Sequence, residues 1–460
     1  MDSIREIVVS LPFLMVISAL IAYVMATRFN LYPVIIYVSK TKGLMDVPEE
    51  RRVHTSQVPN LGGMGLFITF SLTLLLFVPF LNNTVEDLSN LLSLLSATII
   101  LLFLGIKDDL VFMTAKKKLV IQLIAVSMVC ILQDIRITDF HGLLSVGQLP
   151  YVVSVGFTIF VFVLVINAIN LIDGIDGLAS SIGILASLSF GIAFYMAENY
   201  LMTIMSAVLI GSLMGFLKYN LSTDRKIFMG DCGSLIVGFL LAYQGISFLN
   251  IDPTLVYQYN SENSSILLLA ILSYPLFDLL RVFIVRIAQK KSPFDADSNH
   301  IHHRLLRLGL NHKQATMFLV ISNLTLILIT YFTINLPINM SLIVVVCFGC
   351  LLYLLPFLSV FEEFKGEEPE EITPGVRGKI IQVKEEGAKI IPINERILQK
   401  EPFAHNQNNG SLNTEPEHVS TNTTSQKTSE KFKVYANDEK VLVNPIENKV
   451  QIDPDNLKSK

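Results

Sequence analysis

The sequence predicts an all-α, polytopic membrane protein, and three observations lead to this fold class. Of the 460 residues, 52% are hydrophobic and only 16% are charged, which is outside the range of soluble domains. Apolar runs recur along the chain, and most are long enough to cross about 30 Å of hydrocarbon as a helix. Lysine and arginine are concentrated in alternate connecting segments, as in multi-pass membrane proteins.

The apolar runs predict about eleven transmembrane helices. They lie at residues 8–27, 61–80, 89–106, 119–134, 151–170, 178–196, 199–217, 233–250, 265–287, 316–335 and 340–360.

The basic residues predict the orientation of these helices. The segments after the first, third, seventh and ninth predicted helices carry five, four, three and five Lys or Arg residues, whereas the opposite face carries only Arg5 and Arg136. Short loops rich in Lys and Arg stay in the cytoplasm. We therefore expect the N-terminus outside, the C-terminus inside, and the candidate active site on cytoplasmic loops.

The composition changes near residue 361 from apolar residues to Glu, Lys, Asn, Ser, Thr and Pro. Such a segment has little to bury and is typical of disorder. We expect an integral membrane domain at 1–360 and a hydrophilic, largely disordered cytoplasmic tail at 361–460. Two short apolar patches in the tail, 379–383 and 432–443, could form strands of a minor element.

The most specific polar pattern lies at 167–179, where an apolar run gives way to amides, carboxylates and glycines. Asn167, Asn170 and Asp173 are three residues apart and share one helical face, and Asp176 follows in a Gly-Asp turn. Amides can hydrogen-bond a sugar or a base edge, and carboxylates can accept from a hydroxyl group. All four are candidate substrate-binding residues, and the two aspartates are also candidate catalytic residues.

Adjacent carboxylates, Asp108 and Asp109, lie at the expected inner end of the third helix. They repel each other unless they share a cation, and Mg²⁺ is the natural candidate because it takes one or two carboxylates plus substrate phosphates. Both are candidate catalytic and metal-binding residues, and Lys116 nearby is a candidate for binding an anionic substrate. The alternative is that the pair caps or ends a helix.

Asp231 lies between two glycines where the eighth predicted helix starts. A carboxylate beside free helical N–H groups suits a metal–phosphate site, so Asp231 is a candidate metal ligand and Gly230 a candidate substrate contact. Phe228 could stack on a nucleobase. The alternatives are an ordinary helix cap for Asp231 and an interfacial anchor for Phe228.

Cationic candidates come from two further segments. Arg52 and His54 could engage an anionic substrate, although a solvated loop that meets lipid headgroups is the alternative. Near residue 300, three histidines could ligate a transition metal, bind phosphate as imidazolium, or act as general acid and base. No segment offers the Cys and His spacings of a zinc site, so a phosphate-binding patch is favoured. Its candidate residues are His300, His302, His303 and Arg304.

Carboxylates and cations on one membrane face predict phosphoryl transfer, in which catalysis is mostly positioning and charge neutralisation. One substrate would then come from the lipid and the other from the cytosol. A membrane transporter with a carboxylate-lined ion site is the main alternative. A transporter would, however, place polar residues near mid-membrane and show an internal repeat, and we find no repeat.

Five motifs, in order within about residues 40 to 310, resemble the signatures of the polyprenyl-phosphate N-acetylhexosamine-1-phosphate transferases. They are 108–109, 167–179, 228–234, 275–278 and 300–304. The His-Ile-His-His-Arg form of the last motif is similar to the bacterial undecaprenyl-phosphate alpha-N-acetylglucosaminyl 1-phosphate transferases.

The resemblance implies a reaction. N-acetylglucosamine 1-phosphate, or a related N-acetylhexosamine 1-phosphate, would pass from a UDP-sugar to undecaprenyl phosphate, giving undecaprenyl-diphospho-sugar and UMP. This is the first membrane step of cell-envelope polysaccharide synthesis. A single in-line displacement by the lipid phosphate is preferred, and a two-step route through a phosphorylated aspartate stays open.

The resemblance also implies residue roles and partners. Asp108 and Asp109 would help to bind Mg²⁺ or activate the lipid phosphate, and Asp231 would ligate Mg²⁺, for which Mn²⁺ could substitute. The histidine motif would grip the diphosphate and sugar. Expected partners are the UDP-sugar, undecaprenyl phosphate and the lipid bilayer of the bacterial inner (cytoplasmic) membrane; a homodimer is a further possibility, and no nucleic acid is expected. The nucleotide-sugar would be held by Asn170, Asp173 and Asp176.

Overall fold

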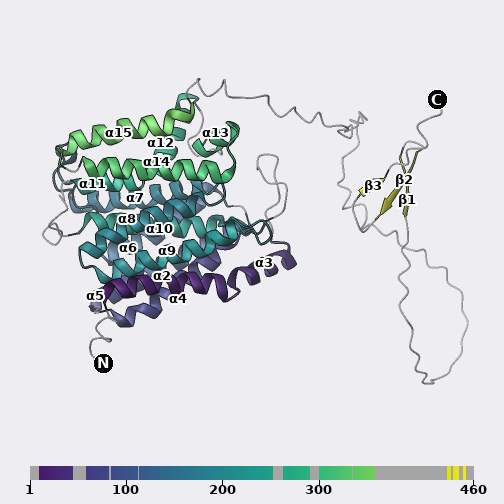
Figure 1. Cartoon of the computed structure of the whole chain (residues 1–460), viewed down its shortest axis with the longest axis horizontal. Helices are drawn as coiled ribbons and strands as arrows, with labels where there is room; N and C mark the ends of the chain where they lie inside the picture. Colours follow the sequence, from purple (N-terminus) through teal and green to yellow (C-terminus); the bar gives the residue numbers. More distant parts are fainter. Residues whose placement is uncertain are drawn as a thin grey trace, which may run out of the picture. The chain divides into compact units, whose positions relative to one another are not determined.

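The computed structural model describes residues 10–44, 58–81, 84–111, 113–251, 263–290, 300–333, 335–357, 432–436, 439–444 and 449–451. The chain divides into two compact units, Met1–Gly375 and Val376–Lys460, which are described separately. Figure 1 shows the long helices of the first unit stacked side by side.

Helices and short connections make up almost all of the described part of the first unit. In chain order they are α2 (Leu11–Arg28), α3 (Leu31–Lys42), α4 (Gly62–Phe77), η1 (Val78–Phe80), α5 (Val85–Leu110), α6 (Ala115–Leu132), η2 (Leu143–Ser145), α7 (Tyr151–Ile172), α8 (Leu178–Met196), α9 (Tyr200–Asn220), α10 (Gly230–Leu249), α11 (Ser264–Ile271), α12 (Ser273–Ala288), α13 (Ile301–Arg307), α14 (His312–Phe332), α15 (Ile338–Leu354) and η4 (Leu355–Phe357).

Nine segments of the described residues are long and apolar enough to cross a membrane. α11 and α12 are bent by 75° relative to each other and add a tenth if they count as one span. The nine are Leu11–Lys42, Gly62–Phe80, Val85–Leu110, Tyr151–Ile172, Leu178–Met196, Tyr200–Asn220, Gly230–Leu249, His312–Phe332 and Ile338–Phe357.

The predicted fold class, a helical polytopic membrane protein, is therefore confirmed for the described part of this unit. Each predicted apolar run falls on a helix, but the number of spans differs from the expected eleven. The run at 119–134 lies on α6, which is not among the nine, because lysines at 116–118 fill its first turn. The run at 265–287 is the bent pair. The expected count and orientation stay predictions.

α10 lies deep in the bundle, with 94% of its most apolar stretch buried, and it packs against α4, α5, α7 and α8. Glycines permit the closest of these contacts. A Cβ on Gly105 of α5 would lie 2.2 Å from Cys232 Cα, and a Cβ on Gly63 of α4 would lie 2.1 Å from the Gly233 nitrogen. Small residues let membrane helices approach in this way, and here they bring the start of α10 against α4 and α5.

The described part of the second unit is a three-stranded antiparallel sheet in the order β1-β2-β3. The strands are β1 (Phe432–Ala436), β2 (Glu439–Asn444) and β3 (Lys449–Gln451). Phe432 pairs with Val443, so the strands expected at 432–443 are confirmed. The patch at 379–383 lies outside the described residues.

Candidate active site

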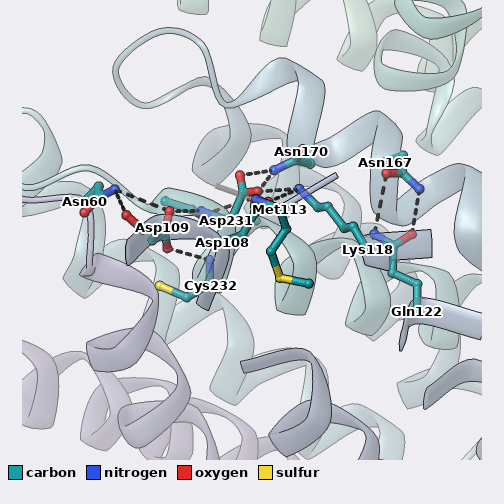
Figure 2. A network of polar contacts seen from close by, with 12 residues as sticks. Asn60, Asp108, Asp109, Met113, Lys118, Gln122, Asn167, Asn170, Asp231 and Cys232 are labelled. Carbon is teal, nitrogen blue, oxygen red and sulfur yellow. Dashed lines mark hydrogen bonds and ion pairs between the residues drawn. The ribbon is translucent and has the colours of Figure 1, made fainter. Parts of the chain in front are cut away.

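Four helix ends meet where the motif carboxylates lie. α5 ends at Leu110, α6 begins at Ala115, α7 ends at Ile172 and α10 begins at Gly230. Figure 2 shows the polar side chains from these ends pointing toward one another. Residues far apart in the sequence thus form one cluster.

The ammonium group of Lys118 lies between two carboxylates. Its Nζ is 3.1 Å from Asp108 Oδ2 and also contacts Asp231 Oδ2. The other oxygen of Asp108 accepts a hydrogen bond from the Met113 N–H at 2.8 Å. The Lys118 and Asp108 side chains are only 15% and 12% exposed, so the ion pair is largely shielded from water. We call Asp108, Lys118 and Asp231 the carboxylate–lysine cluster.

Asp109 points to the N-terminus of α10 and not to Lys118. Its Oδ1 accepts from the Asp231 N–H at 2.9 Å and its Oδ2 from the Cys232 N–H at 3.0 Å. The amide of Asn60 donates to Asp109 Oδ1 at 3.4 Å. Asp109 therefore caps α10 from a neighbouring helix, in line with the alternative that the pair caps a helix. Two of the N–H groups expected to be free for phosphate, those of Asp231 and Cys232, are therefore occupied.

Gly230 is needed for this cap. Its φ is +69°, in the left-handed region that favours glycine. A Cβ at this position would lie 1.9 Å from the Asn60 carbonyl oxygen and 2.8 Å from Asp109 Oδ2. Gly230 thus allows the Asn60 backbone and the Asp109 carboxylate to approach α10.

The two asparagines of α7 bond to the neighbouring helices α6 and α10. Asn170 Nδ2 donates to Asp231 Oδ1 at 2.7 Å and to Ser234 Oγ at 2.8 Å. Asn167, nearly one turn earlier, donates to Gln122 Oε1 of α6 at 3.0 Å. Their spacing of three places both on the face of α7 that meets α6 and α10, as predicted. Asn170 therefore orients the Asp231 carboxylate.

Asp173 begins the turn between α7 and α8 and is half-buried. Burial raises the pKa of its carboxyl well above the ordinary value, and the negative charges of Asp231, Asp109 and Asp176 raise it further. Asp173 thus faces an excess of negative charge, which a bound cation would relieve.

Asp176, at the other end of the same turn, is held by Lys226 and His312. Its Oδ2 accepts from Lys226 Nζ at 2.7 Å and lies 3.1 Å from His312 Nδ1. Thr316 Oγ1 donates to its backbone carbonyl at 3.0 Å. Burial acts to raise the pKa of Asp176, but the hydrogen bonds from His312 and Lys226 outweigh it and hold the pKa below the ordinary range. Asp176 thus links the α7–α8 turn to α14 and to the segment before α10.

The histidine motif forms the start of the short helix α13. Asp278 of α12 accepts from His300 Nδ1 at 2.8 Å and from the Ile301 N–H at 2.9 Å. The ring of His302 stacks on that of His300, with centroids 5.4 Å apart, and is tilted by 47° to that of His303 at 4.4 Å. The three rings therefore form one array that Asp278 anchors.

His302 is fully buried and packs against the α7–α8 turn. A Cβ on Gly174 would lie 2.6 Å from His302 Nε2. Burial lowers the pKa of His302 to about 3, with a further contribution from His303. Burial also lowers the pKa of the half-buried His303. His302 is therefore neutral near pH 7 and differs from the imidazolium expected of a phosphate-binding patch.

Three of the remaining candidates, Phe228, Arg304 and Lys116, belong to the described residues. Phe228 is half-buried, with Lys226 Nζ 5.4 Å from its ring centroid, and its backbone carbonyl accepts from the Gly62 N–H at 3.0 Å. Arg304 donates from Nε to the Pro356 carbonyl at 3.1 Å. Lys116 is exposed on the first turn of α6. Arg52 and His54 lie outside the described residues.

The three lysines at 116–118 were expected to add anion-binding capacity, but Lys116 and not Lys118 was the named candidate. A signal was present, because Lys118 and Gln122 are four residues apart and share one face of α6, and that face meets Asp231 and Asn167. Further residues not predicted to be functional contact the motif aspartates and asparagines. They are Asn60, Gln122, Lys226, Ser234 and His312.

The donor set fits a magnesium ion. Among the described residues, no group of three or more His, Cys, Asp or Glu side chains is arranged to hold a metal. Asp108 and Asp231, however, already share one cation, the Lys118 ammonium. Mg²⁺ commonly takes one or two carboxylates and completes its shell with water and substrate phosphates. Two facing carboxylates within a negatively charged cluster match that requirement.

Comparison with known proteins agrees with this geometry. Residues 91–249 match the model of glycosyl transferase family 4. The matched segment includes α6 to α10 and most of α5, which supply all three members of the carboxylate–lysine cluster. This segment of the chain is therefore similar to that family. The resemblance to the polyprenyl-phosphate N-acetylhexosamine-1-phosphate transferases is confirmed.

Individual relatives are similar over most of their length. A probable undecaprenyl-phosphate N-acetylglucosaminyl 1-phosphate transferase of Bacillus subtilis is 29% identical over 65% of this chain and 81% of its own. A decaprenyl-phosphate N-acetylglucosaminephosphotransferase of Mycobacterium leprae is 29% identical over 59% of this chain and 72% of its own. An undecaprenyl-phosphate alpha-N-acetylglucosaminyl 1-phosphate transferase of Thermotoga maritima is 28% identical over 66% and 94%. These relatives are transferases by name, and the transporter alternative is not supported.

Proposed function

We propose that this protein transfers N-acetylglucosamine 1-phosphate from UDP-N-acetylglucosamine to undecaprenyl phosphate. The products are undecaprenyl-diphospho-N-acetylglucosamine and UMP. The observation that carries the proposal is the carboxylate–lysine cluster, in which Asp108 and Asp231 from separate helices share one cation. The names of the relatives support the sugar and the lipid acceptor.

The preferred chemistry is one in-line displacement. An oxygen of the lipid phosphate forms a bond to the β-phosphorus of the nucleotide-sugar. The bond from that phosphorus to the oxygen bridging to the α-phosphorus breaks, and UMP leaves with this oxygen. The lipid phosphate is already an oxyanion, so no base is needed to activate it. Catalysis then rests on holding two anions together.

A divalent cation, Mg²⁺ with Mn²⁺ as a substitute, is part of the proposal. Asp108 and Asp231 would hold it, and when bound it would neutralise charge on the diphosphate. Asn170 orients Asp231 through its 2.7 Å hydrogen bond, and Lys118 adds a positive charge beside both carboxylates. Asp173, in the turn next to the cluster, is a candidate to hold the nucleotide-sugar.

The capped position of Asp109 favours the one-step route. Both of its oxygens accept hydrogen bonds from the start of α10. Asp109 could become a phosphorylated intermediate only if it gave up these bonds. Its proposed contribution is to fix the start of α10 and hence Asp231.

We further propose that the cluster faces the cytoplasm of a bacterial inner membrane, with the N-terminus outside and the C-terminus inside. The excess of Lys and Arg in the connections on that side supports this orientation. The acceptor would then arrive from the bilayer and the nucleotide-sugar from the cytosol. Assembly as a homodimer is a further proposal.

The direct test incubates membranes containing the protein with Mg²⁺, radiolabelled UDP-N-acetylglucosamine and undecaprenyl phosphate. We expect a lipid-linked radioactive product and an equal amount of UMP, and we expect a chelator of divalent cations to abolish both. Membranes containing the Asp231→Asn variant are the control. Absence of product with this and other UDP-N-acetylhexosamines would contradict the proposal.

A further inference from the structure

The break between α11 and α12 follows from Pro275. Pro275 has no N–H group, so the carbonyl of Ile271, four residues earlier, lacks its usual helical donor. α11 ends at Ile271, α12 begins at Ser273, and the two helices are bent by 75°. Backbone groups freed at such a break need partners from neighbouring helices when they lie within a membrane bundle.

Asn323 of α14 supplies a partner on each side of the break. Its Nδ2 donates to the Ile271 carbonyl at 3.1 Å, and its Oδ1 accepts from the Tyr274 N–H at 3.0 Å. One side-chain amide therefore bridges the end of α11 and the start of α12. Asn323 has 0% exposure, so bulk water does not compete for these bonds.

Two hydroxyl groups complete this arrangement. Ser273 Oγ donates to Asn323 Oδ1 at 2.9 Å, and Tyr353 OH of α15 lies 2.7 Å from Ser273 Oγ. Tyr353 OH also lies 3.2 Å from Asn323 Oδ1. We call Asn323, Ser273 and Tyr353 the break network. All three are buried, and a satisfied buried network of this kind favours one backbone arrangement.

α12 connects the break to the histidine motif. Tyr274 OH lies 3.4 Å from His302 Nδ1. Asp278, one turn further along α12, accepts from His300 Nδ1 and from the Ile301 N–H. α12 therefore helps to fix the position of α13, which also packs against α14 and η4.

α13 also contacts the α7–α8 turn, which carries Asp173. His302 packs so closely against Gly174 that a Cβ there would lie 2.6 Å from its Nε2. A continuous set of contacts thus runs from Asn323 through α12 and His302 to the residue next to Asp173.

We propose that Asn323 is a positioning residue for sugar-phosphate transfer, which holds the break between α11 and α12 and thereby sets the position of α13 against the Asp173–Gly174 turn. The proposal rests on the proposed function. Asn323 acts through α12 and is not a catalytic residue.

The test compares three variants. Asn323→Leu keeps the approximate volume and removes both bridging hydrogen bonds. Tyr353→Phe removes one hydroxyl group from the break network and is the milder change. Ser322→Ala is the matched control, because Ser322 is a buried neighbour whose hydroxyl donates to the Phe318 carbonyl of its own helix at 2.8 Å.

Two quantities are measured for each purified, full-length variant. One is kcat and KM for UDP-N-acetylglucosamine. The other is the distance distribution between spin labels at Leu269→Cys on α11 and Ile284→Cys on α12, which are 39% and 58% exposed. Cys347 and Cys350, which are not buried, are replaced by serine in all samples.

We expect Asn323→Leu to broaden the distance distribution and to lower kcat about 100-fold, as a misplacement of about 1 Å can do. Tyr353→Phe should broaden the distance distribution and lower kcat to a smaller extent. Ser322→Ala should change neither the distribution nor kcat. A label distribution that stays narrow in Asn323→Leu and Tyr353→Phe would overturn the proposal, as would a broadened one with normal kcat. If the unsubstituted protein shows no turnover, the proposed function is wrong. A broadened label distribution in Asn323→Leu distinguishes this outcome from a failure of the inference about Asn323.

Discussion

The neighbouring aspartates Asp108 and Asp109 have different surroundings although they share one motif. Asp108 meets the Lys118 ammonium, whereas Asp109 accepts from two backbone N–H groups of α10. Successive residues of a helix point about 100° apart, so one reaches α6 and the other reaches α10. A charge facing a cation suits ligand binding, and a charge facing a helix N-terminus suits structural support.

Asparagine substitutions should separate these two roles. Asp109→Asn replaces one acceptor oxygen by an NH₂ group that faces a backbone N–H. We therefore expect the free energy of unfolding to fall by about 1–3 kcal/mol, and we expect turnover to be lost as well. Asp108→Asn should abolish turnover with a smaller loss of stability. Thermal unfolding in detergent and the transfer assay measure the two effects. Equal losses of stability in both variants would contradict the assigned roles.

The neutral His302 predicts a dependence of stability on pH. Its pKa is about 3 in the folded protein against 6.5 for an ordinary histidine. Between these values the unfolded chain binds a proton that the folded chain does not. The stabilising contribution is therefore complete above about pH 6.5 and is lost as the pH falls toward 3, by about 1.4 kcal/mol per pH unit.

The His302→Gln variant tests this assignment. Between pH 6.5 and 4, its thermal midpoint should fall less steeply than that of the unsubstituted protein. The exposed Lys116→Gln variant is the control, since it should leave the slope unchanged. An unaltered slope in His302→Gln would show that this histidine does not cause the effect.

At the scale of elements, the cluster depends on how closely α10 approaches its neighbours. The contacts of Gly105 with Cys232 and of Gly63 with Gly233 leave no space for a Cβ. The Asp109 carboxylate reaches the α10 N–H groups because α5 and α10 lie this close. Small residues in the helices therefore determine the geometry of charged residues at their ends.

Gly105→Ala should move α5 away from α10. We expect an overpacking cost of about 1–3 kcal/mol and a large loss of turnover, because the Cβ would meet backbone atoms of Cys232 and not a movable side chain. Gly156→Ala on α7 is the control, since a Cβ there would meet nothing within 4 Å. Thermal unfolding and the transfer assay of both variants check this. Normal turnover in Gly105→Ala would indicate that the close approach is not needed.

At the scale of the whole molecule, the membrane-spanning helices place the candidate chemistry at one end of the first unit. The motif carboxylates lie at the ends of α5 and α7 and at the start of α10. An amphiphilic acceptor and a soluble donor can meet only at such a boundary. The basic connections predict that this boundary is cytoplasmic.

Cysteine labelling tests the orientation at the two ends of α9. Arg225 follows α9 and Asn199 precedes it, and both are exposed. In intact cells, an impermeant thiol reagent should label Asn199→Cys but not Arg225→Cys, and permeabilisation should expose the latter. The reverse labelling pattern would show that the topology is opposite to the proposed one. The variants are made with Cys347 and Cys350 replaced by serine.

The membrane helices and motif carboxylates could be predicted from the sequence because both depend on local information. Apolar length determines where a chain can span a bilayer, and a spacing of three places Asn167 and Asn170 on one helical face. The strands at 432–443 are likewise a local pattern.

Only the tertiary structure decided what each polar side chain contacts. Lys118 and Asp231 are 113 residues apart in sequence, and the spacing of Lys118 and Gln122 on α6 does not by itself show which helix end they meet. The cap formed by Asp109 and the neutral state of His302 arise from contacts between different helices. The reason is physical: composition and periodicity determine which segments form helices, whereas charge pairing and burial depend on which helix ends pack together.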